Sequence, residues 1–465
     1  MRYRTEKDII GERQVPEDAY WGIHTLRASE NFPLSGYRVN PALIKAIVFV
    51  KKAAVLANKE LGYLDAPKAD AIICSCDRIS EGIEKRSFLP EFPVDALQGG
   101  AGTSTNMNVN EVIANCALEI TGKAKGDYTS IDPIEDVNKH QSTNDVYPTA
   151  LKIACIYGLR RLSATIEKTQ GAFQAKEKEF AGIVKMGRTE LQDAVPITLG
   201  AEFSAFAEAF GRDRWRTFKC EERLRVVNIG GTAVGTGLTA PRDYIFLAIE
   251  KLRETTGLGL SRSENLMDAT ANQDPFVEVS GMLKAHASNL VKISGDLRLM
   301  GLLGEVILPR IQAGSSVMPG KVNPVILEAA AQAGMKVIAN DLVVTQCAMK
   351  GSLQIDEFMP LLAHSILESI DIMAGINTVL CTHIGGIGAD PAKCREYLDN
   401  SPAVITAFLP VLGYKKAEEL AKGYSTGRGK SIIRYLEEKL GKEAVEKALS
   451  PQNLTSLGYR NDKNT

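Results

Sequence analysis

The stretch Ala313–Pro324 combines reactive side chains with backbone freedom. It reads Ala-Gly-Ser-Ser-Val-Met-Pro-Gly-Lys-Val-Asn-Pro, with glycines that permit an irregular loop. Asn323 followed by Pro324 is typical of a helix start, with the asparagine as N-cap. Free N–H groups and the helix dipole favour anions at such a start. A serine and a lysine in that setting can carry out proton transfer, although the residue types alone also fit an ordinary loop.

The pattern Gly-Ser-Ser-x-Met-Pro-x-Lys-x-Asn-Pro resembles the signature of the aspartase/fumarase superfamily. The resemblance covers essentially the whole chain and implies a lyase that needs no metal or organic cofactor. By resemblance, Ser315 is the general base, in a loop that closes over the substrate. A serine is a poor base unless its alkoxide is stabilised, and Lys321 with the loop N–H groups is expected to supply that stabilisation. Ser316 is expected to help hold the developing charge, and Asn323 to bind the other carboxylate.

A second polar stretch, Gln98–Glu111, contains closely spaced glycines followed by serine, threonine and asparagine. It suggests a phosphate loop, but no lysine stands where the phosphate-loop motif requires one. It resembles instead the first active-site segment of the superfamily. The resemblance implies that Thr103 and Ser104 contact the substrate.

A third stretch, Val137–Asp145, places hydroxyls and an amide just before a long helix with Pro148 in its first turn. An anion would be stabilised there, although a plain capping cluster explains the residues equally well. By resemblance, Ser142, Thr143 and Asn144 hold the substrate, with Asn144 facing the leaving group.

The stretch Met186–Pro196 resembles the third active-site segment, in which Thr189 and Glu190 face the leaving group. Fumarases usually carry histidine at the place of Glu190, and aspartases carry glutamine or histidine. The resemblance implies that Glu190 lies against Glu328. Two carboxylates in contact cannot both ionise cheaply, so one is expected to take up a proton. We interpret Glu190 as favouring an amine substrate.

Further features bear on the choice of substrate. Arg27 matches an arginine of the family that helps to hold a substrate carboxylate, although a lone arginine usually lies at the surface. The stretch Asp296–Pro309 lacks the Ser-Gly-Pro-Arg that relatives usually carry, which shortens the loop before Ser315. Asp132 stands where fumarases tend to carry histidine. The glycine-rich stretch Gly230–Ala240 is a weak dinucleotide motif without a βαβ pattern, and we interpret it as a turn between helices.

The chain contains long proline-free runs in which apolar residues recur at three- and four-residue steps. These runs predict a mainly α, helical-bundle fold, and its helices are expected to hold the polar segments in position. We expect an N-terminal mostly helical domain at 1–140, a central long-helix bundle at 141–390 and a small C-terminal helical domain at 391–465. The turn at 422–430 is interpreted as structural. The resemblance implies a homotetramer with a helical core and sites shared between three chains.

The composition favours a protein that acts on a small molecule. The chain has 465 residues, 24% charged and 45% hydrophobic, with a formal net charge of -1. Such a balance predicts no nucleic-acid partner, and we expect neither a signal peptide nor a membrane span. The eight cysteines are scattered and without zinc-ligand spacing, so we expect buried thiols in the cytoplasm.

The expected reaction is the elimination of ammonia from L-aspartate to give fumarate, through an aci-carboxylate intermediate. Segments such as Gly11–Pro16 and Asn106-Met-Asn108 look closer to aspartases than to fumarases. Fumarate hydratase is the second interpretation. A related amine-lyase acting on another amino acid is the third, and a non-catalytic relative remains the alternative of a different class.

Overall fold

The prediction of a mainly α fold is confirmed by the computed structural model, which describes residues 2–424 and 431–459. The long helices fall in the proline-poor runs and are α5 (Thr143–Glu179), α6 (Leu199–Leu224), α9 (Asp274–Leu303), α10 (Val325–Ala348) and α11 (Met359–Gly385). Pro148 lies inside α5, beyond the first turn. Proline cannot donate to the carbonyl of Asn144, and the side-chain Nδ2 of Asn228 donates to that carbonyl instead, at 3.0 Å.

The chain forms two compact units. The first comprises residues 1–162, 216–285 and 336–373, and the second comprises residues 163–215, 286–335 and 374–465. The divisions fall inside the five long helices. The three-domain division expected above stays a prediction.

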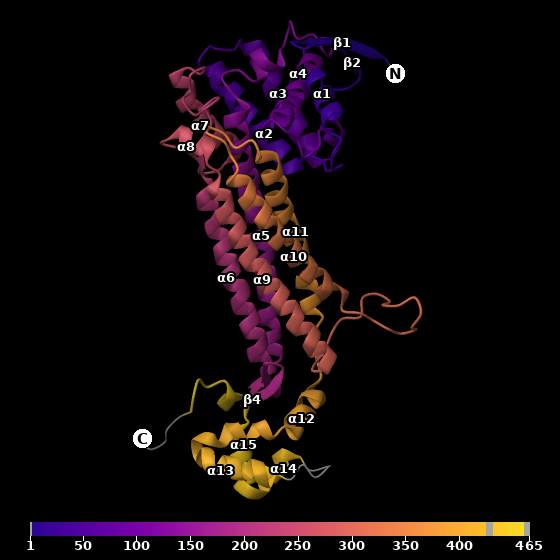
Figure 1. Cartoon of the computed structure of the whole chain (residues 1–465), viewed down its shortest axis with the longest axis vertical. Coiled ribbons are helices and arrows are strands. Elements are labelled where there is room, and N and C mark those ends of the chain that lie inside the picture. The colour runs from indigo at the N-terminus through magenta and orange to yellow at the C-terminus, as the bar shows by residue number, and fades with distance from the viewer. Residues whose placement is uncertain (1, 425–430, 460–465) are drawn as a thin grey trace. The chain divides into compact units, whose positions relative to one another are not determined.

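The first unit groups α1 (Ile23–Asn31), α2 (Pro41–Glu60), α3 (Ala66–Glu84) and α4 (Thr103–Ile120), as Figure 1 shows. Helix α4 is buried on every side from Thr105 to Leu118, which places several asparagines in the interior. The other elements of this unit are β1 (Tyr3–Asp8) and β2 (Gly11–Pro16), which form a hairpin, η1 (Leu89–Glu91), η2 (Pro133–Val137), β5 (Val226–Val227), α7 (Arg242–Thr256), β6 (Ser261–Arg262) and α8 (Leu266–Ala271).

The second unit contains the antiparallel hairpin β3 (Val184–Thr189) and β4 (Gln192–Thr198), whose turn is Glu190-Leu191. Strand β3 contributes Met186 to a core of small C-terminal helices. The C-terminal elements are β8 (Gly388–Ala389), which pairs with β7 (Val306–Ile307), then α12 (Pro391–Asn400), η3 (Pro402–Phe408), α13 (Leu409–Gly423), α14 (Ile432–Leu440), α15 (Lys442–Ala448) and α16 (Pro451–Leu454). Most of the turn at 422–430 lies outside the described residues.

The prediction of buried thiols is confirmed for most of the cysteines, which are all free. Cys74 is exposed, Cys381 is half-buried and the others are buried. Among the described residues, α11 has the length and hydropathy of a membrane span, but 61% of its apolar window is buried within the protein. That burial is typical of a core helix.

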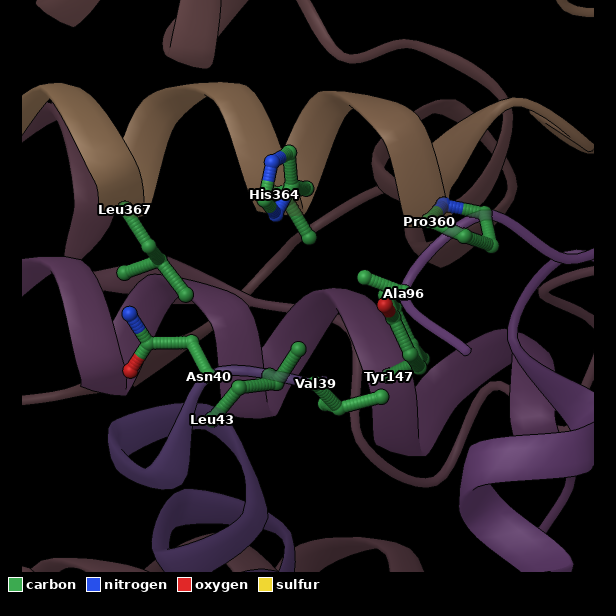
Figure 2. A pocket seen from close by; sticks show the side chains of 9 residues that line it. Val39, Asn40, Leu43, Ala96, Tyr147, Pro360, His364 and Leu367 are labelled. Atoms are coloured by element: carbon green, nitrogen blue, oxygen red, sulfur yellow. The ribbon is translucent and has the colours of Figure 1, made fainter. Parts of the chain in front are cut away.

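A small cavity in the first unit lies among side chains of α2, α5 and α11 (Figure 2). Leu43, Tyr147 and His364 are among the residues that line it, and its volume is about 10 Å³. A space of that size accommodates no more than about one water molecule, so it is not a substrate site.

Candidate active site

The loop that carries Ser315 runs from the end of β7 to the start of α10 and stands away from the helices that flank it (Figure 1). The hydroxyl Oγ of Ser315 accepts two hydrogen bonds, from the backbone N–H of Val317 at 3.1 Å and of Met318 at 2.8 Å. Both donors would stabilise negative charge on Oγ, because hydrogen bonds to an ionised oxygen are the stronger kind. Ser315 therefore has the polar surroundings that an alkoxide base needs. Ser316 next to it is exposed.

The base of this loop is closed by backbone contacts. The N–H of Gly314 donates to the carbonyl of Lys321 at 2.7 Å, and Nδ2 of Asn323 donates to the carbonyl of Gly314 at 3.0 Å. A β-carbon on Gly314 would lie 2.8 Å from the backbone nitrogen of Asn323, so only glycine allows this approach. The Asn323 amide thus ties the loop together, whereas the sequence predicted a helix cap. The Lys321 side chain is exposed.

A cavity of about 830 Å³ lies beside this loop in the second unit. It is lined by the last turns of α9, by residues 308–310, by Gly320 and residues 322–324, and by Glu328. Glu328 lies 3.7 Å from the guanidinium of Arg298, and Arg310 donates to the carbonyl of Gly320 at 3.2 Å. Among the ion pairs and hydrogen bonds of the described residues, none joins Glu328 to Glu190, so their expected pairing stays a prediction.

Thr189 ends strand β3, and Glu190 occupies the hairpin turn, with both side chains exposed. Glu190 and Leu191 have φ values of 52° and 61°. This left-handed conformation suits a two-residue hairpin turn but is unusual for residues other than glycine and asparagine. The turn therefore directs Glu190 outward at a cost of about 1 kcal/mol or more per residue.

A buried ion network holds this hairpin in place. Glu305, which is fully buried, lies between Lys185 and Arg188 of β3, with N–O distances of 2.8 Å and 2.7 Å. Lys185 also pairs with Glu202 of α6 at 2.7 Å. Glu305 directly precedes β7, which leads into the Ser315 loop. The same carboxylate thus anchors the hairpin and the start of the loop.

The first active-site segment starts helix α4 in the first unit. Gly102, at φ 94°, precedes Thr103, whose side chain is exposed, and Ser104, which is half-buried. The left-handed glycine redirects the chain into the helix, so the Thr103 and Ser104 hydroxyls stand at a helix N-terminus. This arrangement favours an anion.

The second segment starts helix α5 in the same unit. The hydroxyl of Ser142 accepts from the N–H of Asn144 at 3.3 Å, and the Ser142 N–H donates to Asp145 at 3.0 Å, which forms a reciprocal cap. Nδ2 of Asn144 donates to the carbonyl of Ala233 at 2.6 Å. Thr143 is buried, and its Oγ1 accepts from Nδ2 of Asn106 at 3.2 Å. The first and second segments are therefore in direct contact.

Asp145 connects the second segment to the glycine-rich turn. Its Oδ2 accepts from the N–H of Gly230 at 3.1 Å and of Thr232 at 3.0 Å. Burial raises the pKa of Asp145 to about 6, although these bonds act in the opposite direction. The stretch Gly230–Ala240 is thus in contact with the start of α5 through Asp145, a contact that the sequence did not predict.

Arg27 has a partner that the sequence did not indicate. Its guanidinium forms two hydrogen bonds with Asp8, at 2.7 Å and 2.9 Å, and a third with the carbonyl of Gly11 at 3.0 Å. The Arg27 guanidinium lowers the pKa of Asp8 to about 2. A substrate carboxylate would have to compete with Asp8 for the guanidinium. This contact argues against the expected role of Arg27 in holding a substrate carboxylate.

The predicted site residues therefore fall into two groups. The first unit carries Arg27, Thr103, Ser104, Ser142, Thr143 and Asn144, and the second carries Thr189, Glu190, Ser315, Ser316, Lys321, Asn323 and Glu328. Sequence reasoning missed the buried supporting groups, Asp145 and Glu305 among them. For Glu305 the only signal was a charged side chain inside an otherwise apolar stretch, and Asp145 stood at the end of a polar run that suggested helix capping. Among residues 2–424 and 431–459, no cluster of three or more histidine, cysteine, aspartate or glutamate side chains could hold a metal ion.

Comparison with known proteins gives full-length matches. A relative from Bacillus sp named aspartate ammonia-lyase is 44% identical over 99% of both chains. Another of that name from Pseudomonas aeruginosa is 46% identical over 97% of this chain and 96% of its own. A solved structure from Brucella melitensis, described as fumarate lyase:delta crystallin bound to cobalt, is 44% identical with a TM-score of 0.92, and the match covers 98% of this chain and 100% of that one.

The family model described as lyase matches residues 11–339, which include every predicted site residue. The chain therefore belongs to the lyase family.

Proposed function

We propose that this protein is an aspartate ammonia-lyase, which converts L-aspartate to fumarate and ammonia. The observation that carries the proposal is the Ser315 hydroxyl with two backbone N–H donors on its oxygen, in a chain 43–46% identical over nearly its full length to proteins named aspartate ammonia-lyase.

The proposed reaction starts with proton removal from the carbon next to the substrate's β-carboxylate. The Ser315 alkoxide takes that proton, and the electron pair moves into the carboxylate, which becomes an aci-carboxylate with two negative charges. The pair then forms the carbon–carbon double bond as the carbon–nitrogen bond breaks, and ammonia leaves. Lys321 and the N–H groups of Val317 and Met318 would lower the pKa of the serine hydroxyl.

Hydroxyl donors would hold the aci-carboxylate while it exists. The donors assigned to it are Thr103, Ser142, Thr143 and Ser316, with Ser104 beside them. Removing one such donor typically lowers kcat about 10²–10³-fold. Asn323 and Lys321 would bind the other carboxylate, and Asn144, Thr189 and Glu190 would face the amine.

The proposed active form is a cytoplasmic homotetramer, in which residues of three chains form each active site. The exposure of Thr103, Glu190 and Lys321 supports this, because these groups are free to meet another copy. Exposed apolar side chains on α9 and α10 support it too, namely Leu299 at 40%, Leu302 at 82%, Met335 at 59%, Ile338 at 38% and Leu342 at 60% exposure. Apolar surface of this extent favours association. Eight free cysteines agree with a reducing compartment.

A second candidate is an amine-lyase acting on another amino acid, and the outward Glu190 favours it. A protonated Glu190 would imitate glutamine, whereas an ionised one would accept a hydrogen bond from an ammonium group. If Glu190→Gln leaves amine turnover and its pH profile unchanged, Glu190 does not select the substrate.

The function is tested by offering L-aspartate, L-malate and a panel of other amino acids separately to the purified protein, with fumarate or its analogue followed by ultraviolet absorbance. Turnover of aspartate alone supports the proposal. Turnover of malate would make the protein a fumarate hydratase, and turnover of another amino acid would favour the second candidate. Inactivity on every substrate would indicate a non-catalytic relative.

A further inference from the structure

Lys51, in the middle of α2, is a lysine with no solvent-exposed surface. Its Nζ donates to Oδ1 of Asn138 at 2.6 Å. Burial lowers the pKa of Lys51 to about 7, which shows how poorly this position suits a charge. The next residue, Lys52, is partly exposed, at 24% of its side chain, and pairs with the more exposed Asp77 at 2.6 Å. The difference in exposure between the two lysines indicates that Lys51 has a role other than carrying surface charge or filling the interior.

The Asn138 side chain collects several donors on one atom. Its Oδ1 accepts from Lys51, and also from Nδ2 of Asn106 and of Asn110, both at 3.2 Å. Lys51 Nζ is the donor in this contact, so the oxygen of the Asn138 amide faces it. The Asn138 Nδ2 donates in the opposite direction, to the carbonyl of Gln141 at 3.1 Å. Lys51 and the Gln141 carbonyl together select one of the two orientations of this amide, with Lys51 acting on its oxygen.

The orientation of Asn138 determines that of Asn106. Because Asn138 presents an oxygen, Asn106 must present its NH₂ group, and the same Nδ2 donates to Thr143 Oγ1 at 3.2 Å. The Asn106 Oδ1 is buried, and among the described residues it has no hydrogen-bond partner, which is equally true of Asn110 Oδ1. Both amides leave an acceptor unsatisfied, at a cost, in order to point their nitrogens at Asn138. The orientation of the Asn106 and Asn110 amides is therefore set by Asn138 and not by their own hydrogen-bonding requirements.

This series of contacts ends at the Thr143 hydroxyl, which the proposed function assigns to the substrate. Thr143 Oγ1 accepts from Asn106, so its own proton is available for donation to another group. If the Asn106 amide were rotated by half a turn, its oxygen would face Thr143, and the Thr143 hydroxyl would donate inward. It would then present lone pairs, and not a proton, to a carboxylate.

We propose that Lys51 is a positioning residue that acts through Asn138 and Asn106 to keep the Thr143 hydroxyl a donor toward a substrate carboxylate. Lys51 itself does not touch the substrate. The inference rests on the proposed function, because that function assigns Thr143 to the carboxylate.

The first test replaces Lys51 with methionine, which has a similar shape and no charge, in the full-length protein. We expect kcat/KM for L-aspartate to fall about 10²-fold, as for loss of one donor to a developing anion. The melting temperature should stay the same or rise, because a buried amino group, for which charge is unfavourable, is removed. The matched control is Lys52→Met, which should remain within about twofold of the unmodified protein, since its partner Asp77 is 60% exposed and such ion pairs contribute little. Equal activity in both variants, or a Lys51→Met protein that loses stability along with activity, would overturn the inference.

The second test is a double-mutant cycle with Thr143→Val. If Lys51 acts through the Thr143 hydroxyl, Lys51→Met should cause no further loss once that hydroxyl is absent. Losses that multiply would show that the two residues act independently, and would overturn the inference.

A binding measurement separates this inference from the proposed function. Succinate is a dicarboxylate without a leaving group, and its dissociation constant can be measured by calorimetry whether or not the protein turns over aspartate. Lys51→Met and Thr143→Val should weaken succinate binding by the same factor, and the double variant by no more. If the unmodified protein makes no fumarate but this pattern is found, the proposed function fails and the inference stands. If aspartate is turned over and Lys51→Met binds succinate normally, only the inference fails.

Discussion

Replacing Gly102 with alanine perturbs the turn that directs Thr103 and Ser104 into α4. Gly102 has φ 94°, a left-handed conformation that side chains rarely adopt. An added β-carbon would lie 2.5 Å from Cε2 of the Tyr147 ring and closer still to its Cδ2. Tyr147 is only 2% exposed and the cavity that it lines measures only about 10 Å³, so its ring has little room to move aside. The substitution therefore combines backbone strain with a steric clash.

The magnitude follows from these two contributions. A left-handed conformation costs a residue other than glycine about 1–2 kcal/mol. Overpacking a tightly filled interior costs about 1–3 kcal/mol more. We expect Gly102→Ala to lower the free energy of unfolding by about 2–5 kcal/mol. Because a shift of about 1 Å in a binding group can lower the rate about 10²-fold, kcat/KM for aspartate should fall by that order.

Gly122, just beyond the other end of the same helix, provides the control. It has φ 73°, and a β-carbon added there would meet no heavy atom within 4 Å. Gly122→Ala should therefore cost only the backbone contribution of about 1–2 kcal/mol and leave turnover unchanged. Urea unfolding followed by circular dichroism measures stability, and fumarate absorbance measures turnover. If the two variants were equally stable and equally active, the proposed clash with Tyr147 would be refuted.

Three further predictions concern buried groups and the catalytic loop. Glu305→Gln should destabilise the protein by about 3–5 kcal/mol in urea unfolding, because Lys185 and Arg188 lose a buried counter-charge; a loss below about 1 kcal/mol would contradict this. The pKa of Lys51, lowered from 10.5 to about 7, means that the folded state releases this proton at lower pH than the unfolded chain. The free energy of unfolding should accordingly rise between about pH 7 and 10.5. In unfolding measurements made across this range, Lys51→Met should reduce that rise. If the free energy of unfolding depended on pH equally in both proteins, this prediction would be wrong. Gly314→Ala should open the base of the loop and lower kcat about 10²-fold with little change in melting temperature; a variant with normal kcat would show that this closure is dispensable.

The long helices were predictable because their signals are local. Proline-free runs with apolar residues at helical spacing correspond to α5, α6, α9 and α10, whereas the run between Pro241 and Pro275 contains the shorter α7 and α8. The loop around Ser315 was identified in the same way, from residue types and a long motif. The hydrogen bonds within that loop were not predicted. The Asn323 amide donates to the carbonyl of Gly314, whereas the sequence predicted that Asn323 caps a helix.

The supporting contacts could not be predicted because they join residues far apart in the sequence. Arg27 binds Asp8 through a hairpin that brings the two together, and Lys51 reaches Asn138 from a different helix. Burial decides such partners, and a single sequence does not show which charged side chains are buried. The expected proximity of Glu190 and Glu328 stays a prediction.

The measurement that tests the central claim most directly is fumarate formation from L-aspartate by the unmodified protein, by Ser315→Ala and by Ser316→Ala. If Ser315 is the base, Ser315→Ala should lose essentially all turnover yet still bind succinate, while Ser316→Ala should retain a residual rate about 10²–10³-fold below normal. Turnover of aspartate by Ser315→Ala at a rate close to that of the unmodified protein would contradict the account.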